Sequence, residues 1–177
     1  AILINRSDTM PNWVNNKTLV IISSYSGNTY ETLESFYGAR KKTDKIISIS
    51  SKSGTINDYC LKHSYIMMNI PSGLQPRCAL GYISSMIILI LARLNLVDSP
   101  RRIRFQLKQS VLELNHINRM HNHGDNSILS ISYQLKNTIP IIYGSEDFTS
   151  VAALRFKNQL QENAKIISFC NNFPEIN

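Results

Sequence analysis

The sequence is poor in cysteine, and the few cysteines show no pairing. Only three occur in 177 residues, and Cys60, Cys78 and Cys170 are not spaced as a metal-ligand or redox pair. An odd number without a signal peptide argues against a disulfide framework, so we expect reduced thiols and a cytoplasmic setting. Arg77 precedes Cys78 and is a neighbour that can activate a thiol. A plain buried thiol is nevertheless the more common state of such a residue.

No hydrophobic run reaches the length of a typical membrane span. The stretch 78–92 is nearly all apolar, but it is shorter than the ~20 residues that cross a bilayer. Gly81, Ser84 and Ser85 interrupt it. Because the stretch is apolar on every side, we expect a core helix that also packs against a partner subunit, and no membrane association. Pro76 suits the first position of this helix.

Signatures of nucleotide and metal sites are also missing. The sequence has no Walker motif, no Gly-x-Gly-x-x-Gly and no Gly-x-Ser-x-Gly elbow. Three histidines, His116, His121 and His123, lie close together, but no cysteine or carboxylate pattern completes a metal site with them. We therefore expect a polar helix end there and no bound metal.

The charge balance favours anionic partners without choosing among them. The chain carries 19 basic and 12 acidic residues, a net charge of +7, within an otherwise ordinary globular composition of 43% hydrophobic and 18% charged residues. Basic residues cluster only at 40–42 and 101–104. Such short clusters are typical of solvated helix ends, so we expect no nucleic acid partner.

Short β-branched runs alternate with helical patterns along the chain, which is typical of an α/β fold with a parallel sheet. The expected strands are 1–4, 18–23, 45–50, 65–70, 139–144 and 165–170, and the expected helices are 29–42, 55–62, 76–92, 99–119, 127–136 and 148–163. A polar turn at 121–126 marks a boundary. We expect a first domain at 1–97, a connecting helix within 98–124 and the start of a second domain at 125–177.

A hydroxyl-rich turn joins the second expected strand to its helix. Residues 23–32 read Ser-Ser-Tyr-Ser-Gly-Asn-Thr-Tyr-Glu-Thr. Two interpretations stay open. Ser26 or Asn28 caps the helix that starts near Thr29, or the hydroxyls and the helix N-terminus bind an anion such as phosphate. Gly27 allows close approach of the backbone or a positive φ.

A polar pattern follows in the second half, Arg155-x-x-x-Gln159-x-x-Glu162. The spacings of four and three place all three side chains on one helix face. Taken alone, a surface polar network is the more common explanation. The functional alternative makes Glu162 a general base, a role that needs a partly buried carboxylate.

Several segments together resemble one family, the archaeal-type bifunctional phosphoglucose/phosphomannose isomerases, which are built from sugar isomerase (SIS) domains. The matching segments are 19–33 (LVIISSYSGNTYETL), 70–82 (IPSGLQPRCALGY), 141–144 (IIYG), 153–165 (ALRFKNQLQENAK) and 173–177 (FPEIN). Their order fits across almost the whole chain. The resemblance implies doubly wound, flavodoxin-like parallel sheets with a phosphosugar at the carboxyl ends of the strands.

The resemblance also implies roles for individual residues. Ser24, Ser26 and Thr29 would hold the sugar phosphate, Arg77 would stabilise charge on an enediolate, and Glu162 would move a proton between C2 and C1. The implied reaction interconverts glucose 6-phosphate, and mannose 6-phosphate as a further substrate, with fructose 6-phosphate. It needs no cofactor, and the implied assembly is a homodimer.

Three features of the family fall outside the sequence. Its glycine-rich loop would precede Ala1, and its ring-opening histidine and a late lysine would follow Asn177. We therefore expect a fragment truncated at both ends and inactive by itself. The alternative function is a non-catalytic SIS module that binds a sugar phosphate.

Overall fold

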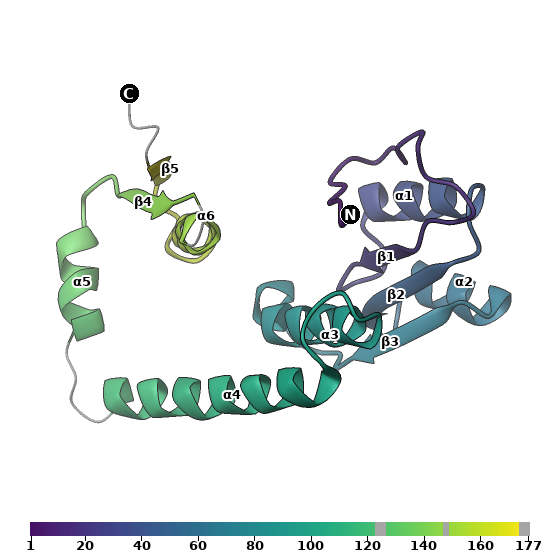
Figure 1. Cartoon of the computed structure of the whole chain (residues 1–177). Coiled ribbons are helices and arrows are strands. Elements are labelled where there is room, and N and C mark those ends of the chain that lie inside the picture. Colours follow the sequence, from purple (N-terminus) through teal and green to yellow (C-terminus); the bar gives the residue numbers. More distant parts are fainter. Residues whose placement is uncertain (123–126, 147–148, 174–177) are drawn as a thin grey trace. The chain divides into compact units, whose positions relative to one another are not determined.

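The computed structural model describes residues 1–122, 127–146 and 149–173 (Figure 1). It divides into two compact units, 1–110 and 111–177. The first unit contains β1 (Val20–Ser23), α1 (Tyr30–Arg40), β2 (Ile46–Ser51), α2 (Thr55–His63), β3 (Ile66–Ile70), the 3-10 helix η1 (Pro76–Ala79) and α3 (Leu80–Arg93). The helix α4 (Pro100–Asn122) contains the division. The second unit contains α5 (Ser127–Leu135), β4 (Ile141–Ser145), α6 (Ser150–Gln159), the π-helix η2 (Leu160–Ala164) and β5 (Phe169–Phe173).

The first unit is a parallel sheet covered on both faces by helices. Its strands pair in the order β1-β2-β3, with Val20 opposite Ile46 and Ile47 opposite Ile66. Figure 1 shows α1 and α2 on one side of the sheet and α3 on the other, in agreement with two separate buried clusters. The prediction of an α/β, doubly wound fold with parallel strands is confirmed.

Alternation along the strands divides the apolar side chains between these two clusters. Ile22 and Ile46 face α1 and α2, where they pack with the fully buried Phe36. Ile49 and Ile70 face the other way and pack with Ile90 of α3. Strands with apolar side chains on both faces are typical of a parallel sheet buried between two helical layers.

The segment 1–4 was expected to be a strand, and this is wrong. Ile2, Leu3 and Ile4 are 60%, 65% and 81% exposed and lie in irregular backbone. The following residues are held instead by local side-chain bonds, such as Asn5 Nδ2 to Thr9 O at 3.0 Å. A β-branched segment forms a strand only when a neighbouring strand pairs with its backbone. Among the described residues, the sheet of β1, β2 and β3 does not include residues 1–4.

The last strand is displaced along the chain relative to its expected position. We expected it at 165–170, and β5 instead covers Phe169–Phe173 and pairs in parallel with β4. Lys165 has a φ of 57° and ends the preceding helix in a left-handed conformation. The residues after it are needed to reach the sheet, so the ladder begins later. The expected helix start at Phe148 lies outside the described residues, and α6 begins at Ser150.

In the second unit, α6 packs on the two parallel strands β4 and β5. The turn before α6 is tight, because a Cβ on Gly144 would lie 2.8 Å from Thr149 O and from Ser150 N. The Thr149 hydroxyl accepts from the Ser145 N–H at 2.7 Å. This turn therefore needs glycine at position 144.

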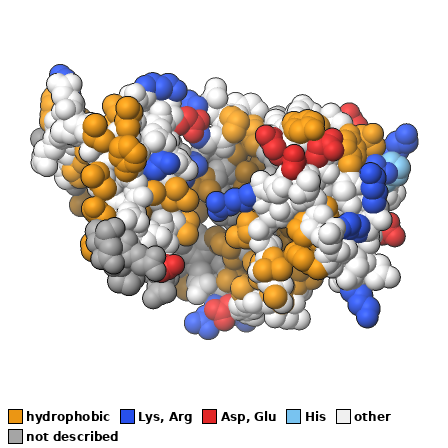
Figure 2. All heavy atoms as spheres, turned by 90° about the horizontal axis from the view of Figure 1, so that it is seen from above, with side chains coloured by type: hydrophobic (Ala, Val, Ile, Leu, Met, Phe, Trp, Pro, Cys, Tyr) orange, Lys and Arg blue, Asp and Glu red, His pale blue; other side chains and the backbone are white. Residues whose placement is uncertain are grey.

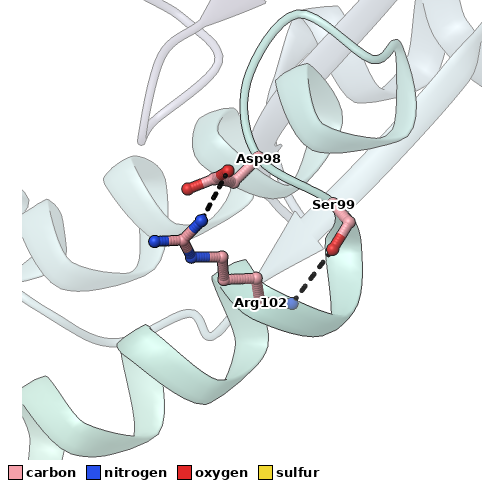
Figure 3. Close-up of polar contacts among 3 residues, drawn as sticks. All are labelled: Asp98, Ser99 and Arg102. Carbon is pink, nitrogen blue, oxygen red and sulfur yellow. Dashed lines mark hydrogen bonds and ion pairs between the residues drawn. The ribbon is translucent and has the colours of Figure 1, made fainter.

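The helix α4 starts at the Ser-Pro step that the sequence indicates. Ser99 Oγ accepts from the Arg102 N–H at 3.4 Å, and the Arg102 guanidinium pairs with Asp98 at 3.3 Å (Figure 3). Pro100 occupies the first helical position, where its missing N–H costs nothing. The Asp98–Arg102 pair is exposed, so it adds little to stability.

The apolar stretch 78–92 lies within a longer helical segment, which consists of η1 followed by α3. The segment Pro76–Arg93 has 18 residues with a mean hydropathy of 1.3, and by length and composition it passes for a membrane-crossing helix. A single helix of this kind is weak evidence, since core helices pass the same test. Here α3 places Ile83, Met86, Ile87 and Ile90 on the sheet, which confirms a core helix for that face. The absence of membrane association stays a prediction.

Large apolar side chains remain on the surface, and Figure 2 shows them in patches between charged ones. On α4, Phe105, Val111, Leu114 and Ile117 are all exposed. On α5, Tyr133 is 75% exposed. Exposed apolar surface of this kind is typical of surfaces that contact other chains, and the expected partner subunit stays a prediction.

The cysteines differ in their environments, and all three are free thiols. Cys60 is buried, and burial raises the pKa of its thiol. Cys78 is exposed, so the expectation of a plain buried thiol is wrong at that position. In η1 the side chain that packs into the core is that of the fully buried Ala79, and the adjacent Cys78 faces solvent.

A histidine at the end of α2 is expected to make the stability of the first unit depend on pH. Arg40 Nη2 lies 3.1 Å from His63 Nε2, and since guanidinium only donates, that nitrogen must accept and the ring is neutral. Desolvation, with the charges of Arg40 and Lys62, lowers the pKa of His63 below its ordinary 6.5.

We therefore expect a stability contribution that is fully present above pH 6.5. It is lost as the pH falls below this value towards the depressed folded-state pKa, because the unfolded chain binds the extra proton. Melting temperatures of wild type and His63→Asn, measured between about pH 8 and about pH 5, test this. That range brackets the ordinary pKa of histidine. The difference in melting temperature between wild type and His63→Asn should become smaller as the pH falls. His116→Asn, on the exposed surface of α4, is the control and should follow wild type.

Candidate functional site

Three hydroxyls converge in the turn between β1 and α1. Thr29 Oγ1 lies 3.3 Å from Ser24 Oγ and 3.4 Å from Ser26 Oγ. Ser24 is buried, and its hydroxyl also accepts from the Gly27 N–H at 3.2 Å. The Ser26 hydroxyl accepts from the Asn28 N–H at 3.2 Å. The three residues expected to bind phosphate are therefore brought together at the carboxyl end of a parallel strand, where ligands bind in such sheets.

The start of α1 keeps its backbone donors available. Its N-cap, Thr29, makes no side-chain capping bond to any described residue. The expected capping role of Ser26 or Asn28 toward this helix is therefore wrong. Asn28 Oδ1 accepts instead from the N–H and hydroxyl of Thr55, at 2.8 and 3.0 Å, at the start of α2. Uncapped N–H groups with the positive end of a helix dipole suit an anion.

Two glycines allow the turn to pack against the loop before α2. Gly27 has a φ of 65° and its carbonyl accepts from the Ile56 N–H at 3.1 Å. Gly54 has a φ of 111°, and a Cβ there would collide with Ser26 O. The hydroxyl turn is therefore supported from behind by the second βα loop. The contact at Gly54 requires the absence of a side chain, and the left-handed backbone at Gly27 favours glycine.

Arg77 belongs to the same unit as the hydroxyl turn. It lies half-buried in η1, after the loop that follows β3. That loop is tied to the turn through Tyr25, whose hydroxyl bonds Pro71 O at 3.1 Å and the Leu74 N–H at 2.7 Å. The turn and the loop that carries Arg77 are thus connected within the first unit.

Glu162 lies in the second unit, in the π-helix η2. Its side chain is exposed there, so the partial burial expected of a general base is not supplied by its own unit. The turn itself is held in place, because Gln161 Nε2 donates to the carbonyl of the buried Ser168 at 3.0 Å. Single π turns occur frequently at functional sites.

The predicted polar network on this helix is present in part. With its amide oxygen toward the guanidinium, Gln159 accepts from Arg155 Nε at 3.0 Å. This geometry agrees with a structural role for Arg155 and Gln159, one turn before Glu162.

Comparisons with known proteins match the chain over nearly its full length. Residues 125–177 match the family described as the bacterial phospho-glucose isomerase C-terminal SIS domain. The bifunctional phosphoglucose/phosphomannose isomerase of Caldicellulosiruptor bescii is 36% identical over 99% of this chain and 52% of its own length. The protein of the same name from Thermoplasma volcanium is 34% identical over 95% of the chain and 50% of its own.

The chain is a homologue of the bifunctional phosphoglucose/phosphomannose isomerases.

It spans about half the length of these curated relatives. Among solved structures, tagatose-6-phosphate ketose/aldose isomerase from Escherichia coli superposes with a TM-score of 0.63 over 91% of this chain and 44% of that one. At 13% identity this likeness establishes the fold alone.

The described residues of this isomerase homologue contain no group of three or more His, Cys, Asp or Glu side chains arranged to hold a metal ion. His116 is exposed on α4, and His123 lies outside the described residues. The absence of a cofactor stays a prediction from the family resemblance.

Sequence reasoning missed the partners of two residues of the site. Tyr25 and Asn28 lie inside the recognised turn, but their partners are far along the chain, at Leu74 and Thr55. No local pattern marks such pairs. The sequence offers one indication that these residues belong to the site. Both are polar and lie between the residues that form the motif.

Proposed function

We propose that the protein is a phosphosugar isomerase. It interconverts an aldose 6-phosphate, glucose 6-phosphate and also mannose 6-phosphate, with fructose 6-phosphate. The observation that carries the proposal is the convergence of three hydroxyls on the uncapped start of α1, in a homologue of phosphoglucose/phosphomannose isomerases. The proposed setting is the cytoplasm, and the proposed assembly is a homodimer.

The reaction assigns a task to each end of the sugar. Ser24, Ser26 and Thr29, with the first N–H groups of α1, hold the phosphate. A carboxylate takes the proton from C2 and returns it to C1, while charge develops on the oxygen of an enediolate. Arg77 stabilises that oxygen because its guanidinium stays charged at any working pH. Glu162 is the proposed base, and this requires it to reach the sugar from its own chain or from a second copy.

Loss of two of the phosphate-binding hydroxyls tests the first assignment. We expect Ser26→Ala/Thr29→Ala to raise the Kd for 6-phosphogluconate about 100-fold or more, because each of the two lost hydrogen bonds to a charged group contributes about 1.5–3 kcal/mol. Isothermal calorimetry measures this Kd directly. Ser110→Ala/Ser132→Ala is the control, since these two hydroxyls donate to carbonyls of their own helices, those of Gln106 and Leu129. An unchanged Kd in the turn variant, with intact folding, contradicts the phosphate assignment.

The exposure of Glu162 within its unit favours a second candidate, a SIS module that binds a sugar phosphate without converting it. Calorimetry with 6-phosphogluconate, combined with a turnover assay on the full-length protein, separates the two functions. Binding with turnover supports the isomerase, and binding without turnover supports the sensor.

A further inference from the structure

We propose that Tyr25 is a positioning residue that sets the distance between the phosphate site and Arg77. The proposal rests on the proposed function, and it deepens it by assigning the spacing of the two binding elements to one hydroxyl. None of the family-derived roles includes Tyr25, and its own side chain faces the loop after β3 rather than the phosphate turn.

The phenol hydroxyl of Tyr25 donates one hydrogen bond and accepts another. It donates to Pro71 O at 3.1 Å and accepts from the Leu74 N–H at 2.7 Å. A tyrosine hydroxyl has one proton to donate, so these two bonds commit it fully to the two ends of one short loop. The partners lie 46 and 49 residues away in the sequence, so the contact is tertiary.

Tyr25 is itself anchored on the sheet. Its backbone carbonyl accepts from the Ser51 N–H at 3.0 Å, which joins it to the end of β2. Its ring is partly buried against the cluster that contains Ile49 and Ile70. The hydroxyl is therefore a fixed point relative to Ser24 and Ser26, which flank Tyr25 in the chain.

The loop that receives these bonds has little packing of its own. Pro71, Ser72 and Gly73 are exposed, and a Cβ on Gly73 would meet nothing within 4 Å. The loop leads directly into η1, where the Cys78 N–H bonds Gln75 O at 2.8 Å and Arg77 lies between them. The far end of η1 is held by the fully buried Ala79, which packs with Ile49 and Ile70. The two bonds to Tyr25 hold the loop at the other end, from which the chain enters η1 and reaches Arg77.

A ligand that spans both elements senses this spacing, and a ligand that fills only the phosphate turn does not. Inorganic phosphate reports on the turn alone. The compound 6-phosphogluconate carries a carboxylate at the C1 end, where the proposed function places Arg77. Its extra affinity over phosphate therefore measures whether Arg77 is correctly placed.

The test compares both ligands on wild type, Tyr25→Phe and the control Tyr133→Phe by calorimetry. Tyr133 loses the same hydroxyl from an exposed position on α5. For Tyr25→Phe we expect the Kd of inorganic phosphate to stay within about twofold and the Kd of 6-phosphogluconate to rise about tenfold. Equal weakening of both ligands, or no weakening of either, overturns the proposal.

Hydrogen exchange gives a second readout that needs no ligand. The Leu74 and Cys78 amides should exchange about tenfold faster in Tyr25→Phe, while amides within α1 keep their protection. Unchanged exchange at Leu74 overturns the proposal whatever the ligands do. If wild type itself binds neither ligand, the proposed function fails, and the exchange measurement still decides whether Tyr25 holds the loop.

Discussion

In the full-length protein, the Glu162→Gln variant is expected to lose about a thousandfold in kcat for hexose 6-phosphate isomerisation, within the range measured for general bases. Glutamine keeps the size of the side chain and its place in η2, but it cannot take the proton from C2. Substrate binding should survive, because the phosphate is held by residues of the first unit. A loss in kcat with little change in the Kd of 6-phosphogluconate is the signature of a group that acts in the transition state.

Turnover of glucose 6-phosphate and calorimetry with 6-phosphogluconate measure the two quantities. Glu113→Gln is the matched control, since it removes a carboxylate from the exposed surface of α4. Normal turnover by the Glu162 variant, with intact folding, shows that another group is the base. The isomerase assignment then rests on the phosphate turn alone.

The Gly54→Ala variant is expected to destabilise the first unit by about 3 kcal/mol or more, because backbone strain and overpacking act together there. Gly54 has a φ of 111°, which residues with a side chain rarely adopt. An added Cβ would also collide with Ser26 O and lie 3.2 Å from Asn28 Oδ1. The collision strikes the hydroxyl turn itself, so phosphate affinity should fall together with stability.

Gly73→Ala separates the two causes. Gly73 has a φ of 84°, but a Cβ there would meet nothing within 4 Å. This variant carries the backbone strain without the collision and should lose only about 1 kcal/mol. Urea unfolding followed by circular dichroism gives both values. Similar losses for the two variants would mean that the close approach of the two loops contributes nothing.

The order of elements could be predicted because it depends on local patterns. Strands such as Ile46–Ser51 are short, β-branched and followed by helices with clear starts, and these features act within a few residues. The same holds for the convergence of Ser24, Ser26 and Thr29, since a strand–turn–helix step brings residues two to five positions apart onto one end of a helix.

By itself, the sequence determined the α/β class, the parallel strands, the hydroxyl turn and the resemblance to the phosphoglucose/phosphomannose isomerases. Only the tertiary structure decided that 1–4 is not a strand, that Asn28 caps α2 instead of α1, and that Tyr25 reaches Leu74. The physical reason is the same in each case. Backbone and side-chain hydrogen-bonding groups take whichever partner the packed chain brings near, and that partner lies far away in the sequence.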